Sequence, residues 1–248
     1  MIALRDAGSM PAVPFLPQCG LIACNIGATE WAPRMDAAKV SQLYAVVEAS
    51  EGAPERLGAA LGAAPIASVL IVPAAGATLE AASAKLLVEV AQEANAAALI
   101  AADPQLARTV RADGVHLQVA KNLVGAYEAA RDILGGRAIV GVDAAISRHD
   151  AMTLAEAGAD YIAFGAPSHL KDRDKARARR DELIVWWAEI FEVPCVAFDV
   201  ETREEAEALS GAGADFIAFR LPAAATPAAT RDLVAGIAAA LAVSETAE

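Results

Sequence analysis

The sequence contains few cysteines, few aromatic residues and fewer cations than anions. Its three cysteines are Cys19, Cys24 and Cys195, without a C-x-x-C pattern. Because they are odd in number and widely spaced, we expect buried or free thiols rather than a disulfide framework or a zinc site. Lys and Arg number 20 against 32 Asp and Glu, a net charge of −12. A chain so acidic, without a basic stripe interleaved with aromatics, predicts no nucleic-acid partner.

Long uninterrupted apolar runs are also absent. The hydrophobic fraction is 56%, but much of it is alanine, and charges or prolines interrupt every run before the ~20 residues that a membrane span requires. Near the start, Arg5 and Asp6 are followed by Pro11, Pro14 and Pro17, which leaves no apolar core for a secretory signal. We therefore expect no membrane partner and a cytoplasmic location.

A strand–helix–strand unit recurs in the second half of the chain. Residues 140–143 form an apolar run ending in aspartate, and a Gly-Ala-Asp tripeptide at 158–160 opens the next apolar run. The same pattern follows 196–199 and the second Gly-Ala-Asp at 213–215, with a weaker echo at 112–117. The glycine is typical of a helix end, and the aspartate of the turn before the next strand. The runs hardly alternate, which predicts parallel strands covered by helices.

Eight strand–helix pairs are predicted along the chain. The expected strands are 43–48, 67–72, 96–101, 114–117, 138–142, 161–164, 193–198 and 216–219. The expected helices include 54–61, 78–93 with Thr78 as cap, 105–111, 122–134, 181–191 and 228–241. Eight pairs favour a (β/α)8 TIM barrel with an N-terminal extension over an open doubly wound sheet.

The first 40 residues are proline-rich and irregular. We divide the chain into an N-terminal extension, 1–40, and a barrel domain, 41–248. The extension is expected either to pack on the barrel or to mediate self-association, so the predicted partners are a small-molecule ligand and a second copy of the chain in a homo-oligomer.

Polar residues that follow the predicted strands are the candidates for a site, because barrel chemistry lies where the strands end. They are Glu48, Asp103, His116, Gln118, Asp143, Ser168, Lys171, Asp199, Glu201 and Arg220. Converging carboxylates can hold a hard cation such as Mg²⁺ or share a proton, while Arg220 and Lys171 can hold an anion.

Each candidate also has a structural interpretation. Asp143 and Asp199 occupy equivalent turns of the repeat, and Asp103 precedes Pro104 as a helix cap would. His116 lies in an apolar strand, where a hydrogen-bonded core histidine fits, and Arg220 could pair with Asp199. The charged run 171–182 is interpreted either as a mobile lid or as a solvated loop entering a helix.

Several of these stretches resemble the thiamine-phosphate synthase family, which includes the thiazole tautomerases. The similar segments are 43–46, 112–117, 141–142 and 158–162, within a region from Leu43 to Leu241. The resemblance implies a (β/α)8 barrel that joins an aminopyrimidine diphosphate to a thiazole phosphate with Mg²⁺ and releases pyrophosphate.

Residue by residue, the resemblance covers the scaffold better than the site. Asp103 stands where a metal-binding aspartate is implied, whereas Lys121 replaces the second carboxylate, and Asp199-Val200 replaces a glycine pair that cradles the thiazole phosphate. Residues 73–75 carry no polar group where the diphosphate anchors are implied.

We accordingly assign Asp103, Asp143 and His116 to catalysis, Asp103 to Mg²⁺, and Gln118, Ser168, Lys171, Asp199 and Arg220 to substrate binding. The chain is then a divergent transferase of thiamine biosynthesis. The alternatives are a non-catalytic or repurposed barrel that binds a different small molecule, and a barrel enzyme of other chemistry that uses the acidic mouth.

Overall fold

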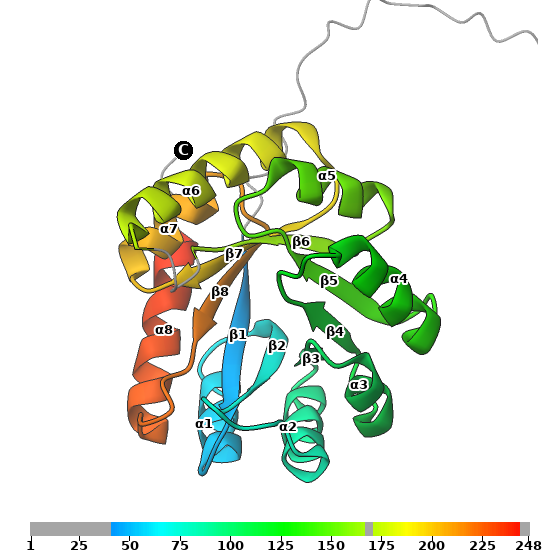
Figure 1. The fold of residues 1–248 in the computed structure, drawn as a ribbon. Helices are drawn as coiled ribbons and strands as arrows, with labels where there is room; N and C mark the ends of the chain where they lie inside the picture. Colours follow the sequence, from blue (N-terminus) through cyan, green and yellow to red (C-terminus); the bar gives the residue numbers. More distant parts are fainter. Residues whose placement is uncertain (1–40, 167–170, 244–248) are drawn as a thin grey trace, which may run out of the picture. The chain divides into compact units, whose positions relative to one another are not determined.

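A computed structural model describes residues 41–166 and 171–243 and shows eight strands alternating with eight helices in these ranges (Figure 1). The strands are β1 (Gln42–Ala49), β2 (Ile66–Pro73), β3 (Ala97–Ala101), β4 (Gly114–Leu117), β5 (Ile139–Asp143), β6 (Tyr161–Phe164), β7 (Cys195–Val200) and β8 (Phe216–Arg220). The helices are α1 (Ala53–Leu61), α2 (Ala81–Glu93), α3 (Pro104–Val110), α4 (Leu123–Leu134), α5 (Arg148–Glu156), α6 (Arg173–Ile190), α7 (Arg203–Gly211) and α8 (Pro227–Val243).

The strands form one closed barrel in the order β1 to β8. Every neighbouring pair is parallel, and β8 returns to β1, where Val46 lies opposite Arg220. The predicted (β/α)8 TIM barrel is therefore confirmed. The division of the chain at residue 40 stays a prediction, because residues 1–40 lie outside the described part.

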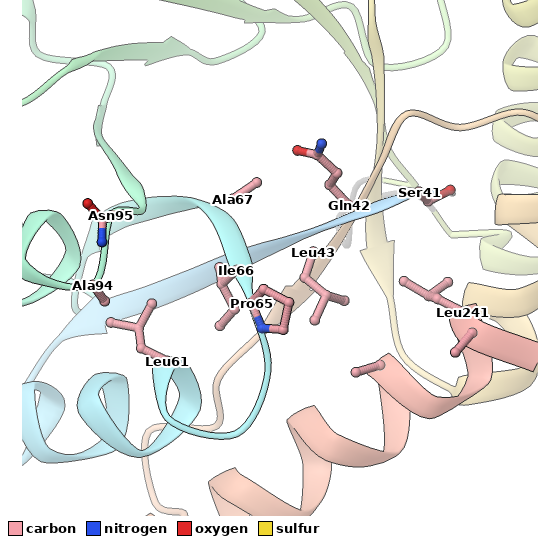
Figure 2. A pocket seen from close by; sticks show the side chains of 12 residues that line it. Ser41, Gln42, Leu43, Leu61, Pro65, Ile66, Ala67, Ala94, Asn95 and Leu241 are labelled. Atoms are coloured by element: carbon pink, nitrogen blue, oxygen red, sulfur yellow. The ribbon is translucent and has the colours of Figure 1, made fainter. Parts of the chain in front are cut away.

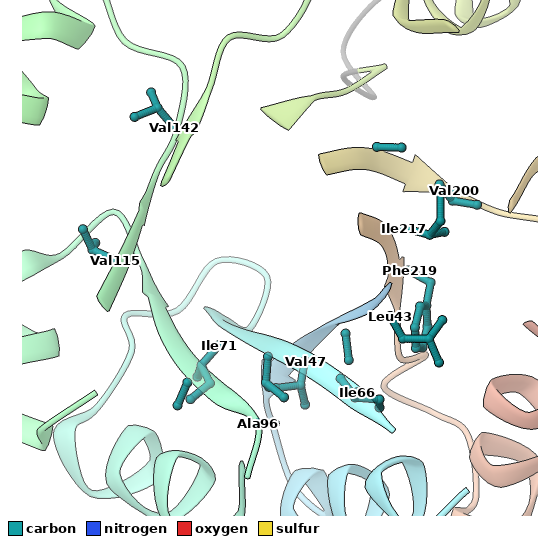
Figure 3. Close-up of a cluster of buried hydrophobic side chains, with 14 of the residues drawn as sticks. Leu43, Val47, Ile66, Ile71, Ala96, Val115, Val142, Val200, Ile217 and Phe219 are labelled. Carbon is teal, nitrogen blue, oxygen red and sulfur yellow. The ribbon is translucent and has the colours of Figure 1, made fainter. Parts of the chain in front are cut away.

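Two apolar layers hold the barrel together, and alternation along β1 separates them. Leu43, Ala45 and Val47 face the helices and belong to the larger core cluster, part of which Figure 3 shows. Tyr44 and Val46 point into the barrel and belong to a second cluster that includes Leu70, Leu99 and Tyr161. Since both faces of β1 are buried, its sequence is a nearly continuous apolar run.

The aspartate of each repeat fastens the start of the preceding strand. Oδ2 of Asp160 accepts a hydrogen bond from the backbone N–H of Val140, and Oδ2 of Asp215 accepts one from Cys195. Asp113, in the weaker echo, accepts from Ala98 in the same way. The glycines at 158 and 213 have φ of +95° and +96°, so they supply the left-handed backbone that the pattern predicts.

Several of the predicted element boundaries are wrong. Helix α2 begins at Ala81 with Glu80 before it, so Thr78 is not its cap. Helix α6 begins at Arg173 rather than near 181. Strand β7 runs from Cys195 to Val200, two residues beyond its predicted end, because the pairing register shifts between Ala197 and Val200.

Candidate active site

A cavity of about 270 Å³ opens at the carboxyl ends of β1, β7 and β8. Val46, Phe198 and Ala218 give it an apolar floor, and Val200 adds to its wall. Its polar lining consists of Arg173, Asp199, Glu201 and Arg220. We call this cavity the mouth pocket. It combines a flat apolar surface with charged groups, as a small-molecule site requires.

Arg220 is paired within the pocket wall. Its Nη1 lies 3.0 Å from Oε1 of Glu48, on the neighbouring strand β1. The alternative interpretation, an ion pair between Arg220 and Asp199, is wrong. Val46 and Glu48 point the same way from β1, and Val46 lies opposite Arg220, so the guanidinium reaches Glu48 along its own side of the barrel.

Asp199 lies in an irregular part of β7, where its φ is +59°. This left-handed backbone belongs to the register shift and turns the carboxylate toward β6, where Oδ2 accepts a hydrogen bond of 3.0 Å from the N–H of Ala166. Removal from water raises the pKa of Asp199 above its usual range, although the Ala166 N–H and the nearby Arg180, Arg220 and Arg173 oppose this. The carboxylate remains accessible to solvent through the mouth.

Arg180 holds the irregular segment of β7 in place. Its side chain is completely buried, and Nη1 donates to the carbonyl oxygens of Phe198 at 2.9 Å and Asp199 at 3.3 Å. Nη2 donates to Glu205 at 2.6 Å, and Nε donates to Asp181 at 2.9 Å. Burial by itself raises the pKa of Glu205, but the Glu201 N–H and Arg180 outweigh it and hold that pKa below its usual range. The guanidinium therefore links α6, α7 and β7 at the rim of the pocket.

The charged run after β6 is the start of a helix rather than a lid or a loop. Asp172 caps α6 by accepting from the N–H of Lys175 at 3.0 Å. Arg173 and Arg177, one turn apart, both bind the carboxylate of Glu201, Arg173 at 2.7 Å. Asp172 as cap and the acidic Asp174 in the first turn favour helix formation here, so the run 171–182 is ordered against the loop after β7.

A column of aromatic and polar side chains fills the barrel below the pocket. The hydroxyl groups of Tyr44 and Tyr161 lie 2.9 Å apart, and the Tyr161 hydroxyl lies 2.9 Å from Nδ1 of His116. The His116 ring stacks on Phe198 with centroids 4.9 Å apart. Gly141 makes room for Tyr161, since a Cβ there would lie 1.9 Å from the phenol ring.

This column determines the protonation state of His116. The side chain is 2% exposed, and burial lowers its pKa to about 4, so the ring is neutral at pH 7. It is the hydrogen-bonded core histidine that its apolar strand suggested, and its contact with the pocket passes through Phe198.

Asp143 ends β5 on the same side of the strand as Gly141. Oδ1 accepts a 2.7 Å hydrogen bond from the Ala145 N–H. Burial, together with the charge of Asp199, raises the pKa of Asp143 to about 6, although the Ala145 N–H acts to lower it. Asp143 is thus a carboxyl group that can change charge near neutral pH in the upper barrel.

The remaining predicted residues lie on the rim. Asp103 is exposed and caps α3, with Oδ1 accepting from the Leu106 N–H at 2.9 Å. Gln118 and Lys171 are exposed on the loops after β4 and β6. Ser168 lies outside the described residues.

The residues at the implied metal position do not fit Mg²⁺. In the described ranges no group of three or more His, Cys, Asp or Glu side chains could hold a metal ion. Asp103 is one carboxylate with an oxygen already committed to its helix, and Lys121 stands exposed where a second anion is implied. A hard divalent cation needs several oxygen ligands, so we derive no step through a metal.

A larger cavity lies at the opposite end of the barrel, near the starts of β1 and β2 (Figure 2). It measures about 650 Å³ and is lined mainly by apolar side chains near the starts of β1 and β2, among them Leu43, Pro65 and Ile66. Barrels of this fold carry their chemistry at the carboxyl ends of the strands, and the described residues that line the opposite cavity include no titratable group. We therefore assign the site to the smaller mouth pocket.

The family model described as thiamine monophosphate synthase matches residues 43–221, which span all eight strands. The chain belongs to this family. A thiamine-phosphate synthase of Erythrobacter litoralis is 46% identical over 115 residues, which cover 46% of this chain and 53% of the relative. One of Rhodospirillum centenum is 44% identical over 115 residues, 46% of this chain and 54% of the relative. The matched segment thus spans about half the length of these curated relatives.

Solved structures confirm the barrel. Thiamine phosphate pyrophosphorylase from Pyrococcus furiosus superposes with a TM-score of 0.64 at 19% identity, covering 84% of this chain and 98% of that one. A tryptophan synthase structure from Mycobacterium tuberculosis superposes with a TM-score of 0.66 at 12% identity, covering 83% and 94%. At these identities the likeness concerns the fold alone. No helix in the described part is long and apolar enough to cross a membrane.

Sequence reasoning missed three parts of the site in this thiamine monophosphate synthase family member. Arg173 was included only in an undivided charged run, although it lines the pocket. The complete burial of Arg180 has one weak signal in the sequence. Arg180 lies four residues from Ala176 and seven from Arg173, which places the three on one face of a helix. Tyr161 is predicted only as part of a strand, whereas its hydroxyl group contacts Tyr44, 117 positions away, and His116, 45 positions away.

Proposed function

We propose that the chain is a transferase of the thiamine-phosphate synthase type, which joins an aminopyrimidine diphosphate to a thiazole and releases pyrophosphate. The family match across all eight strands supports this proposal most directly, and the mouth pocket lies at the end of the barrel where such chemistry is expected. The partners would be small molecules, and the sequence favours the cytoplasm as the location.

In this reaction the bond between the pyrimidine methylene carbon and the diphosphate oxygen breaks, and the oxygen keeps the electron pair. The ring nitrogen of the thiazole then forms a bond to the same carbon with its own lone pair. Positive charge develops on the methylene carbon and ends on the thiazolium nitrogen, while negative charge leaves with pyrophosphate. A barrel that catalyses this step must offer carboxylates to the developing positive charge and cations to the departing pyrophosphate.

The carboxylates of Asp143 and Asp199 suit the developing positive charge. They lie close enough that the charge of Asp199 raises the pKa of Asp143, and both belong to the upper barrel above the aromatic column. Phe198, whose ring rests on neutral His116, supplies the flat apolar surface on which a heteroaromatic ring can stack.

The cations for the departing diphosphate are Lys121 and Lys171. Both are exposed on loops that follow β4 and β6, the strands on either side of β5, and Gln118 lies close to Lys121 in sequence. Ser168, which lies outside the described residues, stays a prediction for substrate binding, and Asp103 stays a prediction for catalysis. Mg²⁺ is the cofactor that the resemblance implies; because the described carboxylates do not form a site for it, the test includes reactions with and without the ion.

The proposal is tested by pyrophosphate release from aminopyrimidine diphosphate, with a thiazole alcohol and its phosphate ester supplied together so that either acceptor can react. We expect multiple turnovers by the purified chain and about a tenfold or greater loss for Lys171→Ala, since one positioned cation contributes that much to a developing anion. Lys175→Ala, an exposed lysine one turn further along α6, is the matched control.

Absence of pyrophosphate release with both acceptors, with and without Mg²⁺, would contradict the transferase. Calorimetry of the diphosphate on the same sample then separates a barrel that binds without reacting from one with a different ligand. The apolar stretch Pro73-Ala74-Ala75 after β2 makes such a repurposed barrel the alternative to be excluded.

A further inference from the structure

The mouth pocket has the size of one small heteroaromatic ring with a short substituent. Its volume is about 270 Å³, against roughly 150 Å³ for a cavity that holds benzene. The apolar floor of Val46, Phe198 and Ala218 fits the ring, and the charged wall receives the substituent. The charges in that wall therefore decide which substituent the pocket accepts.

Both guanidinium groups in the pocket wall already have carboxylate partners. Arg220 is bound to Glu48 at 3.0 Å, and Arg173 to Glu201 at 2.7 Å. Arg177, one turn further along, shares Glu201 and reaches Asp174 and Glu205 at 3.7 and 3.9 Å. The Nε atoms of Arg173 and Arg177 have no hydrogen-bond partner among the described residues, but they are shielded from solvent. These cations are thus neutralised inside the protein.

Among the charged residues that line the pocket, Asp199 is the one whose side chain has no salt bridge within the described residues. Within the described residues, no arginine or lysine forms a salt bridge with its carboxylate, and its hydrogen bond comes from the Ala166 N–H. That N–H belongs to Ala166, a buried residue just after β6. The Asp199 carboxylate therefore accepts this hydrogen bond itself, and Arg180 donates to the backbone carbonyl oxygen of Asp199.

We propose that Asp199 sets the specificity of the mouth pocket for an uncharged alcohol substituent and against a phosphate monoester. A hydroxyl group can donate to the free oxygen of this carboxylate, whereas a phosphate would meet a like charge without a free cation among the described residues of the wall. The inference rests on the proposed transferase and specifies its acceptor as the thiazole alcohol.

The test compares kcat/KM for the thiazole alcohol and for its phosphate ester, each with the same aminopyrimidine diphosphate. We expect the wild-type chain to prefer the alcohol by about tenfold or more, the effect of one uncompensated like charge. Asp199→Gly removes the anion and frees the Ala166 N–H. Because it also removes a carboxylate that we assign to the developing positive charge, kcat/KM should fall for both acceptors, whereas the ratio of ester to alcohol should rise by about tenfold.

The variant should remain folded, because glycine adopts a φ of +59° without the cost that a side chain carries there. Asn95→Gly, at another position with φ of +59° near the opposite end of the barrel, is the control for the backbone change and should leave the preference unaltered.

The outcomes separate the two proposals. Turnover with a preference for the ester overturns the specificity and leaves the transferase intact. Without turnover on either acceptor the transferase fails, and calorimetric titration of both acceptors then decides the specificity: tighter binding of the alcohol supports it, and tighter or equal binding of the ester overturns it.

Discussion

The guanidinium of Arg220 lies 3.0 Å from the carboxylate of Glu48, across the seam where β8 closes the barrel against β1. The two residues are 172 positions apart and are brought together only by barrel closure. The side chains are 55% and 25% exposed, so the pair lies at the pocket surface, where a ligand anion would compete with Glu48 for Arg220.

Glu48→Gln should release Arg220 for anions. We expect the affinity for a phosphate monoester to rise about fivefold, corresponding to roughly 1 kcal/mol for a partly exposed ion pair. Isothermal titration with the ester measures the change. Glu51→Gln, in the exposed turn after β1, is the matched control; an equal gain in both variants would mean that net charge, rather than the release of Arg220, is responsible.

Arg180→Met should destabilise the barrel by about 3 kcal/mol, because it removes the Arg180 donor from Oε1 of Glu205 and from two carbonyl oxygens of β7. Urea unfolding of the wild type and variant measures this loss. Arg179→Met removes a neighbouring arginine paired only on the helix surface, with Glu182 at 3.0 Å, and should change stability by less than about 1 kcal/mol. Equal effects would show that Arg180 does not anchor the segment.

Gly141→Ala tests the aromatic column. The added Cβ would meet the Tyr161 ring at 1.9 Å, so the ring must move and break its contacts with Tyr44 and His116. We expect a loss of about 2 kcal/mol or more, as for overpacked cores. Gly136→Ala, where a Cβ meets nothing within 4 Å, should be close to neutral. Thermal unfolding compares them, and a Gly141→Ala variant as stable as wild type would contradict the packing.

The stability of the barrel should respond to pH through Asp143 and His116 with opposite signs. The pKa of Asp143 is raised to about 6, so the unfolded chain loses this proton first, and stability falls as pH rises from about 4 to 6. The pKa of His116 is lowered to about 4, so the unfolded chain gains this proton first, and stability falls as pH drops from about 6.5 to 4.

Asp143→Asn removes only the first effect. The variant should be more stable than wild type by up to about 3 kcal/mol at pH 7, and this difference should vanish toward pH 4. Urea unfolding at a series of pH values measures the difference. One that stays constant over this range would show that Asp143 keeps an ordinary pKa.

The barrel could be predicted because its information is local and repeated. Apolar runs buried on both faces gave the eight strands, and the Gly-Ala-Asp tripeptides marked the return to the sheet, where Asp160 and Asp215 now bind the preceding strands. Thr78 misled because a good capping residue does not start a helix by itself, and α2 begins three residues later.

The site was only partly predictable. Asp199 and Arg220 could be located, since both follow apolar runs, but their partners depend on strand order and on the irregular pairing of β7. The sequence shows only that the run 171–182 is highly charged, which is typical of a solvated segment. In the structure, Arg173, Arg177 and Arg180 share one face of α6 and bind the carboxylates of Glu201 and Glu205. Such long-range pairing leaves no local signal.

The central claim is that the chain transfers an aminopyrimidine to a thiazole alcohol. Mass spectrometry of a single reaction tests it most directly, with aminopyrimidine diphosphate and equal amounts of the alcohol and its phosphate ester. We expect a coupled thiazolium product that carries no phosphate. A product that carries the phosphate would contradict the specificity, and the absence of any coupled product would contradict the transferase.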